Sequence, residues 1–420
     1  MKILYVSQYY PPEMGAPAAR ACELAQHWVR DGHEVFVLTG FPNHPTGVVP
    51  EEWRSRLRHL AFFEKVNGVN VFRTWLWPLP NRKAHERIRN YASFWLSSSL
   101  RGLTIPRPDV IIATSPQLLV GLSGWWLAFM KRAPFVFEVR DLWPESLTAV
   151  GAGDGDSLLH HALAKIAGFL YDQSDHIVVV TEAFKEHLIR LWRVPPEKMS
   201  VVENGVEADL FAPSAPADRA ALRKQLGAEN RFLVTYVGTM GMAHGLETVL
   251  NAASEFQRQN SNVMFLLLGE GAEKQRIKST AQSLGLSNVL FLDQQVRDKI
   301  PAFIGASDVC LVLLKKTDVF KTVIPTKMLE FMSCARPVIL GVEGQAQQIL
   351  EAANSGLAIE PENSQALVEA ILKLKTNPEL ASALGNQGRE YILRNFSRRQ
   401  TANKYARILH ELTERYPDRH

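Results

Sequence analysis

Cysteine is scarce in this chain, and its scarcity argues against two kinds of fold. Only three cysteines occur in 420 residues: Cys22, Cys310 and Cys334. Their odd number and wide spacing argue against a disulfide framework and against a zinc-binding motif. The apolar run at residues 1–6 becomes polar too early for the hydrophobic region of a signal peptide and is typical of a buried strand. The sequence therefore predicts a protein of the reducing cytoplasm.

The chain also lacks an unbroken hydrophobic run that could cross a membrane. Residues 110–130 carry no charge over 21 positions, and about 20 apolar residues are enough for a spanning helix. However, Ser115-Pro116-Gln117 interrupts this stretch. Its two halves are typical of a strand over 110–113 and a buried helix over 118–130. We therefore predict no transmembrane helix.

Internal repeats and low-complexity tracts are absent as well, and 420 residues are too many for one ordinary core. Short β-branched runs alternate with amphipathic stretches, as in βαβ units around a parallel sheet. A turn-rich break begins at Asn204-Gly205-Val206. We predict an α/β fold of two doubly wound, Rossmann-like parallel-sheet domains, 1–203 and 204–396. A helix over about 397–420 is expected to cross back onto the first domain.

Strands are expected in both domains at residues 2–7, 34–39, 69–74, 110–113, 135–138, 176–180, 200–202, 232–237, 263–268, 289–292, 309–313 and 338–340. Ligands of such sheets bind beyond the carboxyl ends of the strands, where loops enter helices. With two domains, we expect these loops to face a common cleft.

Glycine-rich loops follow three of the expected strands. Gly15 precedes a helix over 16–30, and a second loop follows strand 232–237. A third follows strand 263–268, with Lys274 in the first turn of the next helix. Flexible backbone at a helix start can turn N–H groups toward an anion. Each loop alone could be a plain turn, and Lys274 a solvated lysine. Together they predict a diphosphate site that includes Gly15, Gly238, Thr239, Gly241, Gly269, Gly271 and Lys274.

The segment Pro325-Thr326-Lys327-Met328-Leu329-Glu330 is the strongest single motif. Proline favours a helix start, and positions i and i+3 share one helical face. A carboxylate at Glu330 could accept two hydrogen bonds from a ribose diol, and the Lys327 ammonium could meet a phosphate oxygen beside Thr326. The plain alternative is a surface ion pair.

A charged cluster, Arg140-Asp141-x-Trp143-Pro144-Glu145, follows strand 135–138. Charges at such a point must pair with one another or meet a polar ligand, because burying them alone is costly. Asp154-Gly155-Asp156 imitates a metal-binding D-x-D motif, but Asp156 also suits the N-cap of a helix that starts at 157. We predict no metal and no resident cofactor.

Positive charge is concentrated between Trp53 and Arg107, where eleven Lys and Arg residues face two Glu residues. Residues 81–101 mix this charge with aromatic side chains, which suits an anionic membrane surface. A solvated basic helix is the alternative. Nucleic acid is not expected, because no recognised binding module accompanies the charge and the net charge is only +4.

Taken jointly, these motifs resemble family 4 of the glycosyltransferases, especially members that build bacterial cell-surface polysaccharides. The similarity rests on Tyr9-Tyr10-Pro11-Pro12-Glu13, the Arg140 cluster, Asn204-Gly205-Val206, Gly238 to Gly245, Gly269-Glu270-Gly271 and Pro325 to Glu330. It implies a GT-B fold and metal-independent, retaining transfer of a hexosyl group from a nucleotide diphosphate donor. UDP is the most expected nucleotide, and a polyprenyl-diphosphate-linked or glycan molecule the acceptor. The enzyme would be peripheral on the inner face of the plasma membrane.

By this resemblance, Glu330 matches the second glutamate of the family's E-x7-E motif, whereas Thr322 stands where the first is expected. Thr239 and His244 stand where many members carry an Arg and a Lys for the diphosphate. The charge would then come from Lys327, Arg140 or Lys274, with Lys327 favoured by similarity to a Pro-Ser-Lys subgroup. We expect Asp141, beside Arg140, to lie near the reacting sugar and the acceptor hydroxyl. Two alternatives remain open: a nucleotide-sugar epimerase, and a non-catalytic nucleotide-sugar-binding partner.

Overall fold

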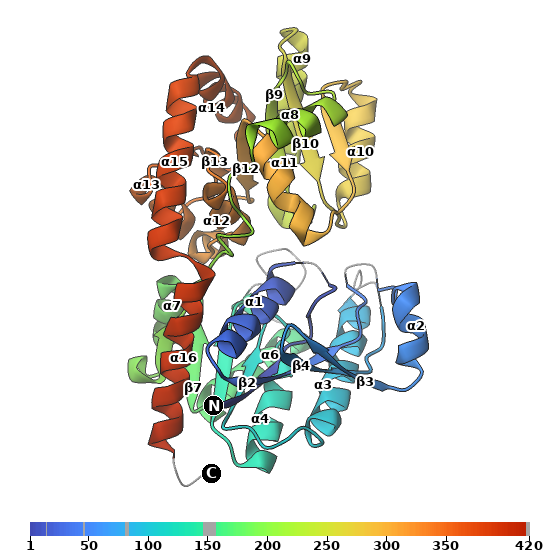
Figure 1. Ribbon diagram of the computed structural model, residues 1–420, viewed down its shortest axis with the longest axis vertical. Coiled ribbons are helices and arrows are strands. Elements are labelled where there is room, and N and C mark those ends of the chain that lie inside the picture. The colour runs from blue at the N-terminus through green and yellow to red at the C-terminus, as the bar shows by residue number, and fades with distance from the viewer. Residues whose placement is uncertain (14, 45–46, 80–83, 146–156, 417–420) are drawn as a thin grey trace. The chain divides into compact units, whose positions relative to one another are not determined.

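The computed structural model describes residues 1–420 except 14, 45–46, 80–83, 146–156 and 417–420 (Figure 1). The chain forms two compact units. Unit 1 contains Met1–Asn204 and Arg398–His420, and unit 2 contains Gly205–Ser397. Each unit is built on its own sheet, so the predicted α/β class with two doubly wound sheets is confirmed.

The sheet of unit 1 has the strand order β3-β4-β2-β1-β5-β6-β7-β8. Its strands are β1 (Lys2–Val6), β2 (Glu34–Gly40), β3 (Ala61–Val66), β4 (Val69–Thr74), β5 (Val110–Thr114), β6 (Phe135–Val139), β7 (His176–Val179) and β8 (Met199–Val201). The chain first builds outward from β1 through β2 and then returns to the other side of β1 with β5. Loops after β1 and β5 therefore lie at the point where the strand order reverses, which is the usual ligand position.

One edge of this sheet differs from the prediction. The sequence analysis missed β3, which pairs antiparallel with β4, Val66 lying opposite Val69. Asn67 and Gly68 connect the two strands with positive φ angles of 50° and 84°. An Asn-Gly pair between strands is a strong hairpin signal, because both central residues of such a turn need positive φ. That dipeptide would have revealed the hairpin.

Helices cover the sheet of unit 1. They are α1 (Ala16–Arg30), α2 (Glu51–Leu57), α3 (Ala84–Gly102), α4 (Leu119–Lys131), α6 (Leu158–Gln173), α7 (Glu182–Trp192) and α16 (Arg398–Arg415), with the 3-10 turn η1 (Pro196–Lys198). The N-cap of α6 is Ser157, whose hydroxyl accepts from the His160 N–H, and not the predicted Asp156. A serine at this position satisfies one free N–H of the first turn.

The last helix, α16, completes the core of unit 1, and Figure 1 shows it beside α1. Trp28 of α1 donates its indole N–H to the Ala402 carbonyl at 3.1 Å and packs edge-on against Tyr405. Arg398 pairs with Glu23 at 2.8 Å. The C-terminal helix therefore buries apolar surface of α1 and belongs physically to the first unit.

Unit 2 has an entirely parallel sheet with the order β11-β10-β9-β12-β13-β14. Its strands are β9 (Phe232–Val237), β10 (Val263–Leu268), β11 (Val289–Leu292), β12 (Val309–Leu313), β13 (Val338–Gly341) and β14 (Gly356–Ala358). Here the order reverses at β9 and β12, so the loops after these two strands mark the ligand position. The short edge strand β14 was not predicted.

The helices of unit 2 are α8 (Pro216–Gln225), α9 (Glu247–Arg258), α10 (Lys274–Ser283), α11 (Ile300–Ala306), α12 (Thr326–Ser333), α13 (Gln345–Ala352), α14 (Ser364–Thr376) and α15 (Pro378–Asn395). Three 3-10 turns accompany them: η2 (Met242–His244), η3 (Arg297–Lys299) and η4 (Asp318–Thr322). Throughout the described part of the chain, each helix is too short or too polar to span a membrane.

Candidate active site

Two glycine loops of unit 2 pack backbone against backbone beyond the carboxyl ends of β9 and β10. Gly238, Gly269 and Gly271 all have φ near +140° to +155°, a conformation that side-chain-bearing residues rarely adopt. A Cβ on Gly269 would lie 1.9 Å from the Gly238 carbonyl oxygen, and one on Gly271 would lie 2.4 Å from that of Met240. Glycine is therefore required here for close packing, and this packing fixes the loop that follows β9.

The loop after β9 is not the start of a helix, as the sequence analysis had assumed. The short turn η2 follows it, and α9 begins only at Glu247. The N–H groups of Gly238 and Met240 donate to the carbonyls of Leu268 and Glu270. These two N–H groups already donate within the protein and are not available to a bound anion. The loop therefore provides space for an anion rather than free N–H donors at a helix start.

Lys327 lies against this loop. Its Nζ is buried, has no hydrogen-bond partner among the residues that the structure describes, and lies 4.0 Å from the centre of the Tyr236 ring. A Cβ on Gly238 would come within 2.9 Å of that Nζ, so the absence of a side chain at Gly238 leaves room for the amine. Burial lowers the pKa of Lys327 to about 7, although the Glu330 carboxylate raises it. An ammonium without a partner at this position needs an anion.

Glu330 occupies the same helix, α12, one turn further on. Its Oε1 accepts a hydrogen bond from Arg297 at 3.0 Å, and the carboxylate is largely buried. The guanidinium of Arg297 also lies 4.9 Å from the Phe211 ring centre. The sequence analysis did not identify Arg297, since nothing in its local pattern links it to α12. Thr326 is the first residue of α12, as predicted, and Pro325 is its N-cap.

Positions 239, 244 and 322, where the resemblance leads one to expect Arg, Lys and Glu, carry uncharged side chains. Burial, and then the charge of Lys327, lower the pKa of His244 to about 3. His244 is therefore neutral at pH 7. Thr239 accepts the Tyr236 hydroxyl at its carbonyl, and the Thr322 hydroxyl donates to Val319 within its own turn. Of Lys327, His244 and Thr239, only Lys327 can carry a positive charge near pH 7.

Lys274 is held by carboxylates of the protein itself. Its Nζ lies 2.5 Å from Glu270 and 2.5 Å from Asp293. An external anion was expected here because a lysine at a helix start needs a negative partner. Glu270 and Asp293 are the negative partners of Lys274. The structure thus gives Lys274 a structural role between the loop after β10 and the end of β11.

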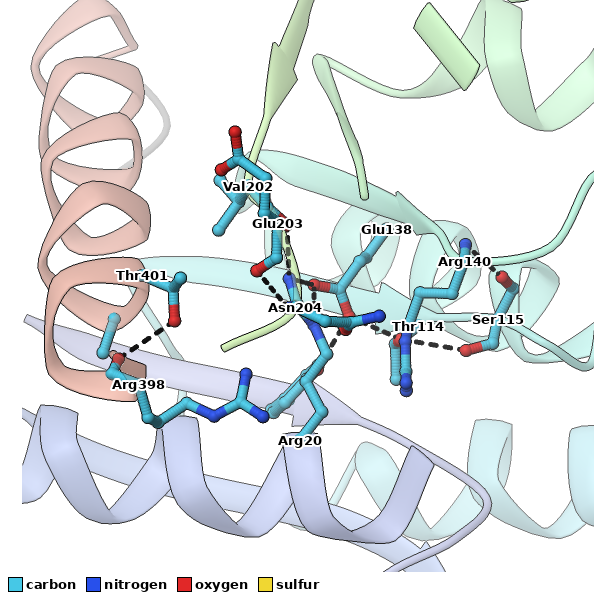
Figure 2. A network of polar contacts seen from close by, with 12 residues as sticks. Arg20, Thr114, Ser115, Glu138, Arg140, Val202, Glu203, Asn204, Arg398 and Thr401 are labelled. Atoms are coloured by element: carbon cyan, nitrogen blue, oxygen red, sulfur yellow. Dashed lines mark hydrogen bonds and ion pairs between the residues drawn. The ribbon is translucent and has the colours of Figure 1, made fainter. Parts of the chain in front are cut away.

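In unit 1, a buried ion pair connects α1 to the sheet (Figure 2). Arg20 donates to Glu138 through Nε and Nη2 at 3.1 and 2.8 Å, and both side chains are inaccessible to solvent. The other Glu138 oxygen accepts from the hydroxyls of Tyr5 at 2.8 Å and Thr114 at 2.5 Å. Every oxygen of this carboxylate is satisfied. The sequence analysis did not predict this pair, because its partners are far apart in the chain.

Arg140 lies beside this network at the end of β6. Its backbone N–H donates to Ser115, which follows β5 (Figure 2). Its Nε and Nη1 are buried and have no hydrogen-bond partner in the described part of the chain. Burial lowers the pKa of the guanidinium to about 10, and the charge of Arg20 adds to the effect. Glu138 is already saturated by other donors, so Arg140 is a second buried cation available to an anion.

The rest of the Arg140 cluster does not act as one unit. Glu145 pairs with His187 at 3.2 Å and also accepts from Trp192, which ties it to α7. Asp141 is only partly buried, and its negative charge contributes to raising the pKa of Tyr91 and of Tyr171. Gly15 is the N-cap of α1, as expected, with φ of 132°. Of this cluster, Arg140 and Asp141 remain candidates for a ligand site.

Among the residues that the structure describes, no three His, Cys, Asp or Glu side chains gather as a metal site would require. The Asp154-Gly155-Asp156 motif lies outside those residues. The three cysteines are free thiols, two of them buried.

Comparison with known families covers both units. Residues 15–205 match the family model of the glycosyl transferase 4-like domain, and residues 218–391 match that of glycosyl transferases group 1. Together these matches span most of the chain and leave out only residues 1–14, 206–217 and 392–420.

Among curated proteins, the chain is 26% identical over 380 residues to WcaI of Escherichia coli, whose name assigns it to colanic acid biosynthesis as a glycosyl transferase. That match covers 88% of this chain and 91% of the relative. WbjE of Pseudomonas aeruginosa, also named a glycosyltransferase, is 24% identical, covering 73% of this chain and 75% of its own length.

Solved structures show the same fold. HepE of Anabaena in complex with UDP has a TM-score of 0.70 at 19% identity, covering 98% of this chain and 100% of that one. WaaG, a glycosyltransferase involved in lipopolysaccharide biosynthesis, has a TM-score of 0.69 at 17% identity, covering 97% and 99%. Both halves of the chain thus point to one family, and the protein is a glycosyltransferase of the GT-B fold and the family 4 type.

Proposed function

We propose that this glycosyltransferase moves a hexosyl group from a nucleotide diphosphate donor, UDP-linked in the first instance, to a lipid-linked or glycan acceptor with retention of configuration. The observation that carries this proposal is the buried, partnerless Nζ of Lys327 beside the glycine loop after β9. Its place at the reversal of strand order in unit 2 suits a nucleotide site. HepE, a structural neighbour, is solved with UDP.

The chemical step needs positive charge where the nucleoside diphosphate leaves. As the glycosidic bond breaks, negative charge develops on the departing oxygen, and an ammonium fixed in a buried position stabilises it strongly. Lys327 would supply that charge in place of a metal ion, and Glu330 would contact the ribose diol. Because Glu330 already pairs with Arg297, the diol would share this carboxylate with the guanidinium.

Unit 1 would receive the acceptor. Arg140, with two buried nitrogens that lack partners, suits an anionic group of the substrates. Asp141 follows it directly and is partly exposed, so it would orient the attacking hydroxyl or accept its proton. Retention and metal independence are carried over from the resemblance to family 4.

A donor screen tests this function. Thermal-shift measurements with UDP-, GDP- and dTDP-sugars in EDTA should show stabilisation by one nucleotide class, since a ligand at 100 times its dissociation constant adds about 2.7 kcal/mol. NMR of the product made with a polyprenyl-diphosphate-linked sugar should then show the anomeric configuration of the donor. Inverted product, or stabilisation only with a divalent metal, would contradict the proposal. Conversion of the donor without acceptor would favour an epimerase instead.

A membrane surface is proposed as a partner of unit 1. The segment 81–101, which mixes basic and aromatic residues, includes most of α3, although residues 81–83 lie outside the described structure. Exposed apolar side chains gather near the C-terminal ends of α3 and α4, where Lys131 donates to the Leu103 carbonyl. They are Leu100, Leu103, Phe129 and Met130. Arg107 and Arg132 are exposed in the same region, so the patch combines apolar and basic groups, as binding to anionic lipid requires.

Vesicle sedimentation tests this partner. The full chain should bind vesicles containing phosphatidylglycerol more tightly than pure phosphatidylcholine vesicles, each basic residue near the surface contributing about 1 kcal/mol. A Leu100→Ser/Phe129→Ser variant should lose most of this binding. Leu393→Ser removes an exposed leucine from unit 2 and serves as the matched control. Equal binding by both variants would reject this surface.

A further inference from the structure

A series of hydrogen-bonded, buried polar side chains in unit 1 includes neither Arg140 nor Asp141 and is not used by the proposed chemistry. It runs through the carboxyl ends of β1 and β2 and into α3. Gln8 donates to Asn90 at 2.6 Å, Asn90 donates to Asn43 at 3.3 Å, and the Asn43 backbone N–H donates to Glu13 at 2.8 Å. The four side chains are all more than nine-tenths buried.

Within the part of the protein that the structure describes, the side chains at both ends of this hydrogen-bonded series, Gln8 and Glu13, each have one acceptor oxygen that lacks a donor. Glu13 uses Oε1 for the backbone N–H groups of Asn43 and His44, at 2.8 and 2.9 Å, whereas its Oε2 is buried and has no hydrogen-bond partner among the described residues. Gln8 uses its Nε2 for Asn90, and its Oε1 is likewise buried and unpaired. An unsatisfied buried acceptor is costly, and a carboxylate more so. A ligand that satisfies both atoms must bring hydrogen-bond donors.

Arg73, whose positive charge acts on Glu13, does not fill this role. Arg73 is held by Glu64 at 2.6 Å and by the backbone carbonyls of Gly40 and Pro11. The ring of His44 packs at a tilt of 51° against that of Tyr9, and burial lowers the pKa of His44, so it is neutral at pH 7. Within the described residues Glu13 therefore forms no ion pair, in contrast to Glu23 of the same unit, which pairs with Arg398.

We propose that Glu13 and Gln8 form a subsite of unit 1 that accepts hydrogen bonds from hydroxyl groups of a sugar ring in the acceptor. This inference rests on the proposed function, which requires an acceptor hydroxyl. Above about pH 7, where Glu13 is ionised, its carboxylate repels an anion, so a phosphate is excluded as the occupant there. The position after β1, where the strand order of unit 1 reverses, is the one at which such sheets bind ligands.

Binding of simple sugars to the full chain tests this subsite without any donor. Saturation-transfer NMR with methyl α-D-glucopyranoside, mannopyranoside and galactopyranoside should detect at least one of them. Glu13→Gln, which turns an acceptor into a donor, should weaken that binding about tenfold or more. Its melting temperature should not fall, because the substitution removes a buried charge that has no partner.

Glu23→Gln is the matched control. It removes the charge of another buried carboxyl group of unit 1, so it should lower the melting temperature while leaving sugar binding unchanged. No saturation transfer to any of the three glycosides, or equal binding by wild type and Glu13→Gln, would overturn the proposal. A UDP titration of the wild type runs in parallel: failure there would count against the proposed function and not against this subsite.

Discussion

Lys327 is the residue whose protonation should control nucleotide binding. Its pKa is lowered to about 7 by burial, and a bound diphosphate would raise that pKa again. At a pH between the pKa of Lys327 in the free protein and its higher pKa in the complex, binding of UDP takes up a proton. Affinity for UDP should therefore fall as the pH rises above about 7, by up to tenfold per pH unit. Calorimetric titrations from pH 6.5 to 9, in buffers of different ionisation enthalpy, measure both the affinity and the proton uptake.

The variant Lys327→Met should bind UDP more weakly and lose this dependence on pH. Turnover should fall by orders of magnitude, while the fold remains intact. Lys321→Met is the control, because Lys321 is an exposed lysine near α12 that pairs with Asp318 and Glu343. If the pH dependence persisted in Lys327→Met, another group would be responsible for it.

Glu13 should make unit 1 less stable as the pH rises. Burial raises its pKa to about 7, although backbone hydrogen bonds from Asn43 and His44 and the charge of Arg73 lower it. The folded state therefore holds a proton that the unfolded chain has lost above about pH 4.5. The stability contributed by this proton is complete below that value and is lost as the pH rises through about 7.

Thermal unfolding of wild type and Glu13→Gln at several pH values measures this effect. The advantage of the variant should grow from pH 4.5 to 7 and then stay constant. A constant difference over the whole range would show that Glu13 does not titrate as described.

The close backbone packing of the two glycine loops of unit 2 should make substitution of Gly269 destabilising. Gly269→Ala should cost at least about 2 kcal/mol, since its Cβ would meet the Gly238 carbonyl and its φ of +149° is strained for any side chain. Gly241→Ala is the control in the same loop pair: its φ is −112°, and its Cβ would make only ordinary contacts at 3.7 Å. Denaturant unfolding should separate the two variants clearly. Equal stability would show that the loops do not pack as described.

The Arg20–Glu138 pair joins α1 to the central strands of unit 1. Arg20→Met should cost about 3 to 5 kcal/mol, because it leaves a buried carboxylate without its cation. The double variant Arg20→Met/Glu138→Met should cost less than Arg20→Met alone, since neither charge remains. A double-mutant cycle by chemical denaturation measures the coupling, and additive effects would contradict the pairing.

For the whole chain, the structure predicts that removal of residues 398–420 destabilises one unit only. Trp28 of unit 1 would lose its contacts with Ala402 and Tyr405 of α16. Unit 2 has its own core and ends before this helix. Differential scanning calorimetry should show a lower melting temperature for one transition and an unchanged second transition. A loss of stability in both would contradict this division.

The sequence allowed the sheet architecture to be predicted because strands of a parallel sheet are continuous apolar runs, such as Phe232–Val237. The hairpin of β3 and the Ser157 cap needed turn and cap details that the strand pattern does not contain. At the candidate site, helical spacing predicted that Lys327 and Glu330 share α12. It could not predict that one is buried without a partner while the other pairs with Arg297, because tertiary packing decides those contacts.

The central claim is that Lys327 and the glycine loop after β9 hold the diphosphate of the donor without a metal. A crystal structure of the full chain with UDP, grown in EDTA, tests it through one distance. We predict that a diphosphate oxygen lies within about 3.2 Å of Lys327 Nζ. UDP bound elsewhere, or a binding mode in which Lys327 keeps no contact with the diphosphate, would contradict the account.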